Sequence, residues 1–198
     1  MTRWQPDSRG RLQEAAMELY GERGYDQTTV AEIAERAGLT ERTFFRHFAD
    51  KREVLFAGSQ NLQDVLVGAV AEAPDTAAPI EAVAAGLDAV AALFDDRRDY
   101  SRRRHAIIAA NPELQERELI KFASLASALA DVLRRRGVAE ASLVAEVGIA
   151  VFKIAFGRWV DDANEQDLPE LMRESLDAIV DLSAVRSSSH HDDERSRR

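Results

Sequence analysis

The hydrophobic and polar positions of the chain follow a helical period of three to four residues from the first segment onward. Leu12, Ala16 and Tyr20 mark one apolar helix face, and Gly24 follows as a stop signal. Comparable amphipathic runs continue through most of the sequence, and no segment alternates strictly between apolar and polar residues as a strand would. The pattern therefore predicts an all-α fold of about nine helices.

The second and third predicted helices are short and closely spaced. Thr29 and Glu32 form a capping box at the start of the second helix, in which each side chain can bond the backbone N–H of the other. Gly38 can adopt the left-handed backbone of a tight turn, and Thr40 is a suitable N-cap for a third helix through Phe48. Two such helices joined by a short turn are typical of a helix-turn-helix, which presents its second helix to the major groove of DNA.

Longer helices are expected in the rest of the chain. Asp50 and Glu53 form a capping pair that predicts a fourth helix opening at Lys51. The last two long helices are expected at about 140–162 and 168–185. Further breaks in the pattern fall at residues 73–79, 95–99, 111–112, 137 and 161–169.

The distribution of charge changes what the net charge implies. A formal net charge of -9 argues against a nucleic-acid partner, because phosphate neutralisation requires Lys and Arg on the binding surface. The first 52 residues, however, hold nine Lys and Arg against nine Asp and Glu. The acidic excess therefore lies outside the N-terminal quarter, and an acidic body would leave only one face of the molecule able to approach DNA.

The composition excludes several kinds of site. Without cysteine, the chain has no disulfide, no thiolate metal site and no cysteine nucleophile, and we expect no cofactor or metal. The N-terminal segment is polar, and the most apolar later stretch, residues 144–160, is interrupted by Glu146, Lys153 and Arg158. We therefore expect a cytoplasmic protein with no targeting segment and no membrane span.

Residues 28–51 carry a specific resemblance. They read TTVAEIAERAGLTERTFFRHFADK and follow Gly24-Tyr25. This string resembles the helix-turn-helix of the TetR family of transcriptional regulators, and the likeness covers residues 9 to 56. The stretch 102–137 is similar to actinobacterial members of the family, including regulators beside redox-cofactor gene clusters. The resemblance implies a sequence-specific DNA-binding regulator that responds to a ligand.

The resemblance also implies a domain plan. A flexible arm at 1–8 would precede the DNA-binding domain at 9–56, and a helical ligand-sensing and dimerisation domain would follow at 57–186. Homodimers would form through the last two long helices, which places two recognition helices on a palindromic operator. The apolar surface expected for this contact comprises Val144, Val147, Val151, Ile154, Val160, Leu171, Leu176, Ile179, Val180 and Leu182, with small Gly148 and Ala155 allowing close approach. Residues 187–198 lack an apolar anchor and are expected to be a disordered tail.

Individual DNA contacts follow from the resemblance. Thr28 and Thr29 would lie against a phosphate, although capping alone also explains Thr29. Arg42 would meet a base edge and pair with O6 and N7 of guanine, whereas His47 and Lys51 would donate to the DNA backbone. The full set of implied contacts is Thr28, Thr29, Thr40, Glu41, Arg42, Thr43, Phe45, Arg46, His47 and Lys51.

Two positions depart from the family pattern. Phe45 stands where a tyrosine is usual, which removes a hydroxyl contact to phosphate that Arg46 would replace. Ala31 stands where a longer side chain often reaches a base, so base readout is expected to narrow to the third helix. Phe44 and Phe48 lie four residues apart and are expected to face inward.

The sensing domain is expected to hold a pocket among its middle helices. Arginine triplets at 102–104 and 134–136 favour a ligand with phosphate or carboxylate groups, although the second triplet also suits a helix end before Gly137. The effector would be hydrophobic or similar to an acyl thioester of coenzyme A. Aromatic residues at helical spacing are more often plain core than ligand contacts. The candidate wall residues are Leu66, Phe94, His105, Ile107, Phe122, Phe152, Phe156 and Trp159.

The favoured interpretation is a repressor that a ligand releases from its operator, with the fourth helix tilting to separate the recognition helices. An enzyme would need a nucleophile beside a base, and of four histidines only His105 lies outside the DNA motif and the C-terminal segment. A DNA-binding protein that senses nothing would not need so large a second domain. A protein-interaction module would leave Arg42, His47 and Lys51 without a role.

Overall fold

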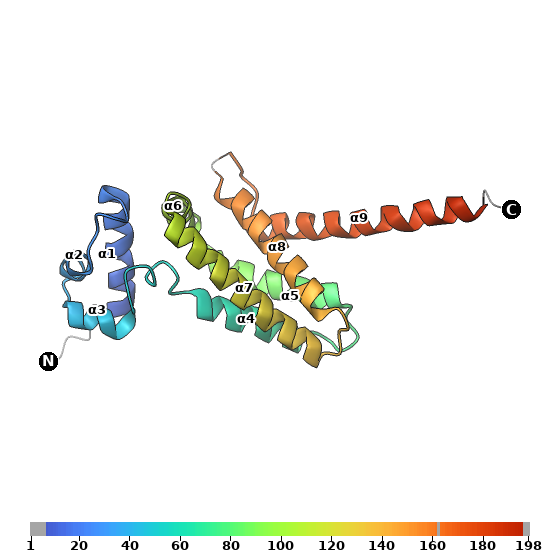
Figure 1. Cartoon of the computed structure of the whole chain (residues 1–198), viewed down its shortest axis with the longest axis horizontal. Helices are drawn as coiled ribbons and strands as arrows, with labels where there is room; N and C mark the ends of the chain where they lie inside the picture. The colour runs from blue at the N-terminus through green and yellow to red at the C-terminus, as the bar shows by residue number, and fades with distance from the viewer. Residues whose placement is uncertain (1–6, 162, 196–198) are drawn as a thin grey trace. The chain divides into compact units, whose positions relative to one another are not determined.

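The computed structural model describes residues 7–161 and 163–195, with side chains described as far as Asp181. Every regular element in these residues is a helix, which confirms the all-α prediction (Figure 1). The helices are α1 (Ser8–Arg23), α2 (Val30–Arg36), α3 (Glu41–His47), α4 (Ser59–Glu72), α5 (Pro79–Ala91), the short 3-10 helix η1 (Ala92–Phe94), α6 (Arg98–Ala109), α7 (Pro112–Arg135), α8 (Ala141–Val160) and α9 (Leu168–Arg195).

The helices group into two compact units. The first unit runs to Leu62 and includes residues 99–123, whereas the second comprises residues 63–98 and those from 124 onward. This grouping differs from the predicted boundary at residue 56, because α6 and the first half of α7 complete the first unit. Both α4 and α7 contribute residues to each unit.

The core of the first unit shows why the later helices belong to it. Leu12 of α1 and Phe44 of α3 are fully buried in one hydrophobic cluster. Ile108 of α6 and Leu114 of α7 are buried in the same cluster. The apolar stripes of helices distant in sequence therefore meet in a single core, which fixes the position of α3.

The local signals around the helix-turn-helix are confirmed. Thr29 and Glu32 form the predicted capping box, and the Thr40 side chain accepts a hydrogen bond from the amide of Thr43 at the start of α3. Gly38 has a φ of 64°, the left-handed conformation that the turn requires. The bounds of α2 and α3 agree with the predicted short helices.

The predicted start of the fourth helix is wrong. Asp50 accepts hydrogen bonds from the amides of Arg52 and Glu53 as a cap would, but Lys51–Gly58 form turns and α4 begins at Ser59. In this stretch the amides of Leu55, Phe56 and Ser59 donate to carbonyls three residues back. These turns are tighter than an α-helix, and they place Val54 to Phe56 in the core of the first unit before α4 begins.

The second unit is closely packed around α5, α8 and α9. A Cβ added at Gly86 of α5 would lie 2.7 Å from Val70 of α4, and one at Gly148 of α8 would lie 2.7 Å from Val83 of α5. Figure 1 shows α9 as a long helix of this unit that begins beside α8. It extends to Arg195, past residue 186, where the predicted folded part ends. The rest of the expected tail, 196–198, lies outside the described residues, as does most of the expected arm at 1–8.

Candidate DNA-binding surface and effector site

The third helix presents two different faces. Phe44 and Phe48 point into the core with their ring centroids 5.5 Å apart, as predicted. Arg42, Phe45 and Arg46 are exposed, and their i, i+3 and i+4 spacing places them on one outward face. This face combines two guanidinium groups, which donate hydrogen bonds to bases or phosphates, with an aromatic ring that is 55% exposed. We refer to these three residues as the α3 face.

The four threonines of the predicted contact set differ in how they are engaged. Thr28 is buried, and its hydroxyl donates to the carbonyl of Gly24 over 2.9 Å. The exposed Thr29 donates to Glu32 over 2.9 Å, and hydrogen bonds from its amide and hydroxyl lower the pKa of Glu32. The hydroxyls of Thr40 and Thr43 are 3.1 Å apart beside exposed Glu41 at the start of α3. Their contacts with DNA remain predictions.

His47 connects two helices within the first unit. Its Nε2 atom lies 2.7 Å from the hydroxyl of Ser8, the first residue of α1, and 3.4 Å from a guanidinium nitrogen of Arg46. The half-buried imidazole therefore joins the start of α1 to the end of α3. The sequence pattern did not indicate this link, and donation by His47 to the DNA backbone remains a prediction.

The side chain of Lys51 points toward the turn between α1 and α2 in the first unit. Its ammonium group donates to the carbonyls of Tyr25 and Thr28 over 2.9 and 3.0 Å, and to that of Asp26 over 3.3 Å. These carbonyls lie in the turn that joins α1 to α2. The predicted phosphate contact of Lys51 is not tested by the free protein, but any such contact would compete with these bonds.

An ionic cluster joins the α3–α4 connection to α7. Glu53 pairs with Arg117 over 2.6 Å and with Lys121 over 3.4 Å. Nearby, Arg104 of α6 donates to the carbonyl of Leu55 over 2.7 Å and pairs with Glu118 of α7. All of these charged side chains are partly buried, so solvent screens them less than ordinary surface pairs. Arg104 thereby has a structural use that the predicted anionic-ligand role did not anticipate.

Half of the predicted effector-pocket residues form one aromatic cluster in the second unit. The Phe94 ring lies 5.4 to 6.1 Å, between centroids, from the rings of Phe156, Trp159 and Phe152. Leu66 is buried close to Gly86, whereas Ile107 packs against the core of the first unit. His105 and Phe122 also belong to the first unit. The structure therefore brings four of the eight candidates together.

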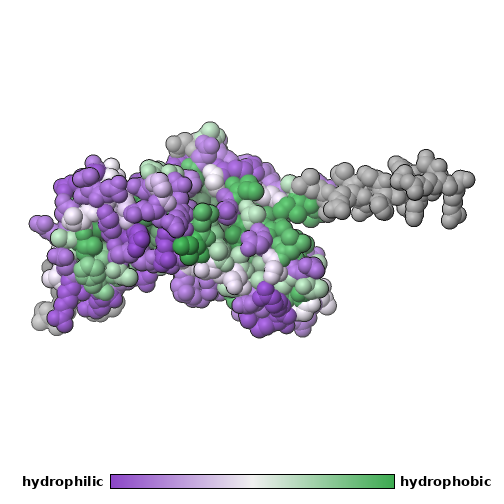
Figure 2. All heavy atoms as spheres, viewed as in Figure 1, coloured by the Kyte–Doolittle hydropathy of each residue, from purple (hydrophilic) through white to green (hydrophobic). Residues whose placement is uncertain are grey.

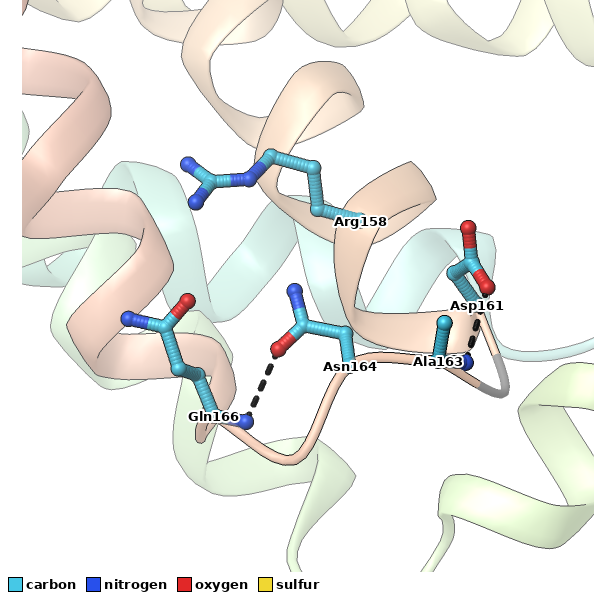
Figure 3. Close-up of a pocket in the computed structure, with 5 residues that line it drawn as sticks. All are labelled: Arg158, Asp161, Ala163, Asn164 and Gln166. Atoms are coloured by element: carbon cyan, nitrogen blue, oxygen red, sulfur yellow. Dashed lines mark hydrogen bonds between the residues drawn. The ribbon is translucent and has the colours of Figure 1, made fainter.

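A separate open pocket of about 410 Å³ lies at the connection between α8 and α9 (Figure 3). None of the eight predicted wall residues lines it. Arg158, which does line it, pairs with Glu174 over 2.8 Å, so the charge of this guanidinium is already neutralised. The other lining residues are Asp161, Ala163, Asn164 and Gln166.

The described residues offer neither a metal site nor a membrane-spanning helix. Among the side chains that the structure describes, those of residues 7–161 and 163–181, no group of three or more His, Asp or Glu is placed to hold a metal ion. Within the same ranges, no helix is long and apolar enough to span a lipid bilayer.

Comparison with protein-family models identifies the family of the chain. Residues 12–57 match the model of bacterial regulatory proteins of the tetR family, and residues 77–183, more than half of the chain, match the MftR C-terminal domain. The chain belongs to the TetR family. The resemblance inferred for residues 9 to 56 is thus confirmed, and this TetR-family protein is a DNA-binding transcriptional regulator.

Individual relatives differ in how much of the TetR-family chain they match. A Mycobacterium tuberculosis protein assigned as the mycofactocin biosynthesis regulator MftR is 24% identical and covers 86% of each chain. The regulator TcmR of Streptomyces glaucescens is 36% identical over 83 residues, which are 42% of this chain but only 37% of TcmR. The structure of the repressor FadR of Thermus thermophilus with lauroyl-CoA has a TM-score of 0.53 and 25% identity, covering 87% of this chain and 93% of FadR.

Proposed function

We propose that this TetR-family protein represses transcription by occupying a palindromic operator as a homodimer, and that an apolar effector releases it. The observation that carries the proposal is the α3 face, which exposes two arginines and an aromatic ring on the helix that a helix-turn-helix places in the major groove. The protein would act in the bacterial cytoplasm, where the chromosome lies. An enzymatic role is not proposed, because the matched relatives are regulators.

Selection of bound DNA from a random pool tests the proposal. The purified protein is incubated with the pool at near-physiological salt, because the phosphate contribution varies steeply with ionic strength. Recovery of a palindrome with half-sites about one helical turn apart supports a two-fold dimer that reads sequence. A pool that shows no enrichment after repeated rounds contradicts it.

Arg42→Ala is expected to weaken binding to the selected operator by about 1 to 3 kcal/mol and to flatten the preference at one base pair. The guanidinium is exposed in the first turn of α3, where the helix dipole disfavours a cation unless an external anion or acceptor faces it. Titration of operator variants measures both effects. As a control, Arg103→Ala removes an exposed arginine outside the helix-turn-helix and should change neither the affinity nor the base preference. If Arg42→Ala weakened binding to the operator and to random DNA equally, Arg42 would have no role in base readout.

The proposed dimer surface lies on the second unit. Leu143, Val147, Ala150 and Ile154 recur along one face of α8, and Leu143 and Ile154 are 62% and 59% exposed. Val180 of α9 is also 50% exposed. Figure 2 shows hydrophobic side chains gathered over α8 and the described part of α9, whereas polar atoms dominate much of the first unit. A stripe of this kind indicates an interaction surface.

The structure corrects the composition of this surface. The expectation included Gly148, Val151 and Ala155 of α8 and Leu171 of α9, but all four are buried within the unit. Gly148 allows close approach of α5, not of a second chain. Val147, Ile154 and Val180 belong to the expected set and are exposed or partly exposed, whereas Leu143 was not foreseen.

The effector is proposed to bind beside the aromatic cluster of Phe94, Phe152, Phe156 and Trp159. Such a cluster favours an apolar ligand, and the related FadR was solved with lauroyl-CoA. Arg136 donates to the carbonyls of Ala73 and Pro74. Its guanidinium is therefore already engaged within the protein, which leaves fewer arginines of the two triplets to bind a coenzyme A headgroup. Lauroyl-CoA is the first compound to titrate against the operator complex. Operator release at micromolar concentration would support this effector class, and no release by saturated acyl-CoA esters of any length would oppose it.

Coupling between effector and operator is proposed to run through α7. Residues 112–123 of this helix are part of the first unit, and residues 124–135 are part of the second. Glu53 forms ion pairs with Arg117 and Lys121 in the first half of the helix. Glu53→Gln is expected to leave operator affinity within about threefold while reducing the effect of the effector by several-fold. Operator affinity with and without effector measures the ratio. An unchanged ratio would return the coupling role to α4.

A further inference from the structure

We propose that Lys51 is a positioning residue of the DNA-binding surface, whose ammonium group fixes the turn between α1 and α2 and makes no contact with DNA phosphate. The proposal rests on the DNA-binding function described above and assigns one of its lysines a structural role. It replaces the phosphate contact that the family resemblance implied for this residue.

The hydrogen bonds of the ammonium group carry the first step. A lysine ammonium has three N–H donors and no acceptor. In the structure three backbone carbonyls face it, those of Tyr25, Thr28 and Asp26, at 2.9, 3.0 and 3.3 Å. The donors are therefore fully used inside the protein, and a phosphate could gain one only if a carbonyl of the turn lost its partner.

The surroundings of Lys51 provide a second, independent link. Its ammonium nitrogen lies 4.3 Å from the centroid of the buried Tyr25 ring, within the range of a cation–π interaction. The Tyr20 hydroxyl donates to the carbonyl of Lys51 over 2.7 Å, and burial raises the pKa of Tyr20, so that this hydroxyl keeps its proton. Both the backbone and the side chain of Lys51 are thus held by residues of α1 and of the turn that follows it.

The turn that Lys51 holds determines where α2 begins. Residues 25–28 lead directly into Thr29, the N-cap of α2, and α2 in turn packs against α3. If the ammonium were removed, three carbonyls would lose their donor together, and the start of α2 would be released. The α3 face would then be presented less uniformly to DNA of any sequence. A positioning role predicts weaker binding without a change in the number of neutralised phosphates.

The salt dependence of operator binding separates the two roles. Lys51→Met keeps the length of the side chain but removes its charge and donors, and Arg46→Met removes an exposed cation from the α3 face. We expect Lys51→Met to lower affinity by about tenfold with the slope of log K against log salt unchanged. Arg46→Met should lower the slope by about 0.9, the value for one phosphate contact. A slope that falls by about the same amount in Lys51→Met would overturn the proposal.

Lys51→Arg provides a second test that does not depend on loss of charge. A guanidinium serves a phosphate at least as well as an ammonium does, but its planar fork cannot converge on three carbonyls. We therefore expect Lys51→Arg to bind the operator several-fold more weakly than the wild type. Wild-type affinity in this variant would restore the phosphate role.

Measurements without DNA keep the proposal distinct from the proposed repressor function. Both Lys51 variants should show a lower thermal midpoint and faster hydrogen exchange at the amides of residues 25–29 than the wild type. Arg46→Met should show neither change. If the wild type recovered no operator, the repressor proposal would fail while these two measurements still decided the role of Lys51. If hydrogen exchange at the amides of residues 25–29 were unchanged in Lys51→Met, the positioning role of Lys51 would be wrong.

Discussion

Phe44→Ala should destabilise the first unit by about 3 to 5 kcal/mol, the usual cost of removing a fully buried phenylalanine. The Phe44 side chain has no exposed surface and packs 5.5 Å from the Phe48 ring in the cluster that also contains Leu12, Ile108 and Leu114. A loss of this size is a large share of the 5 to 15 kcal/mol that typically stabilises a domain. Urea denaturation followed by circular dichroism measures the change, and operator binding should be lost with the fold.

Phe45→Ala is the matched control, because the same substitution is made one residue away on the exposed face of α3. Phe45 is 55% exposed, so the stability of the unit should change by less than about 0.5 kcal/mol. Operator affinity should nevertheless fall, since an apolar ring on a recognition helix can contact the methyl group of thymine. Replacement of each operator thymine by uracil would locate that contact. If Phe45→Ala destabilised the unit as strongly as Phe44→Ala, the assignment of the two faces would be wrong.

The features of the fold that were predictable from sequence are local. The capping box of Thr29 and Glu32, the left-handed Gly38 and the N-cap Thr40 all act between residues at most a few positions apart. Such signals specify where a short helix starts and stops whatever the rest of the chain does. For this reason the helix-turn-helix and the inward orientation of Phe44 and Phe48 were correctly predicted.

The structure differs from the sequence pattern where distant parts of the chain decide the packing. Asp50 and Glu53 carry a correct capping signal, yet residues 51–58 form turns that place Val54 to Phe56 in the core of the unit. Nothing near residue 56 shows that Ile108 and Leu114 will complete the same core. Apolar periodicity indicates that a face is buried but not which helix covers it.

The arginines of the chain illustrate the same limit for functional sites. From sequence, the triplets at 102–104 and 134–136 favoured an anionic ligand. In the structure Arg104 and Arg136 donate to backbone carbonyls of connecting segments, as Lys51 does. A cation that binds carbonyls at a helix end or turn has the same sequence signature as one that binds a ligand. The contacts in the folded protein distinguish the two uses.

Ile154→Asp should raise the dissociation constant of the proposed dimer by at least about 100-fold, which corresponds to roughly 2.7 kcal/mol. The side chain is 59% exposed in the single chain, and a two-fold interface would bury the introduced carboxylate of each subunit without a partner. Sedimentation analysis over a range of protein concentrations measures the constant. Operator affinity should fall with it, because a monomer can occupy only one half-site.

Leu119→Asp is the matched control for the dimer, since Leu119 of α7 is 60% exposed and lies outside the proposed interface. This variant should remain dimeric and keep its operator affinity, because its carboxylate stays in water. If Leu119→Asp dissociated into monomers while Ile154→Asp stayed dimeric, the interface would have to be assigned to α7 instead of α8. In that case effector coupling through α7 would act directly at the contact between subunits, and Glu53 would connect the operator surface to the partner chain.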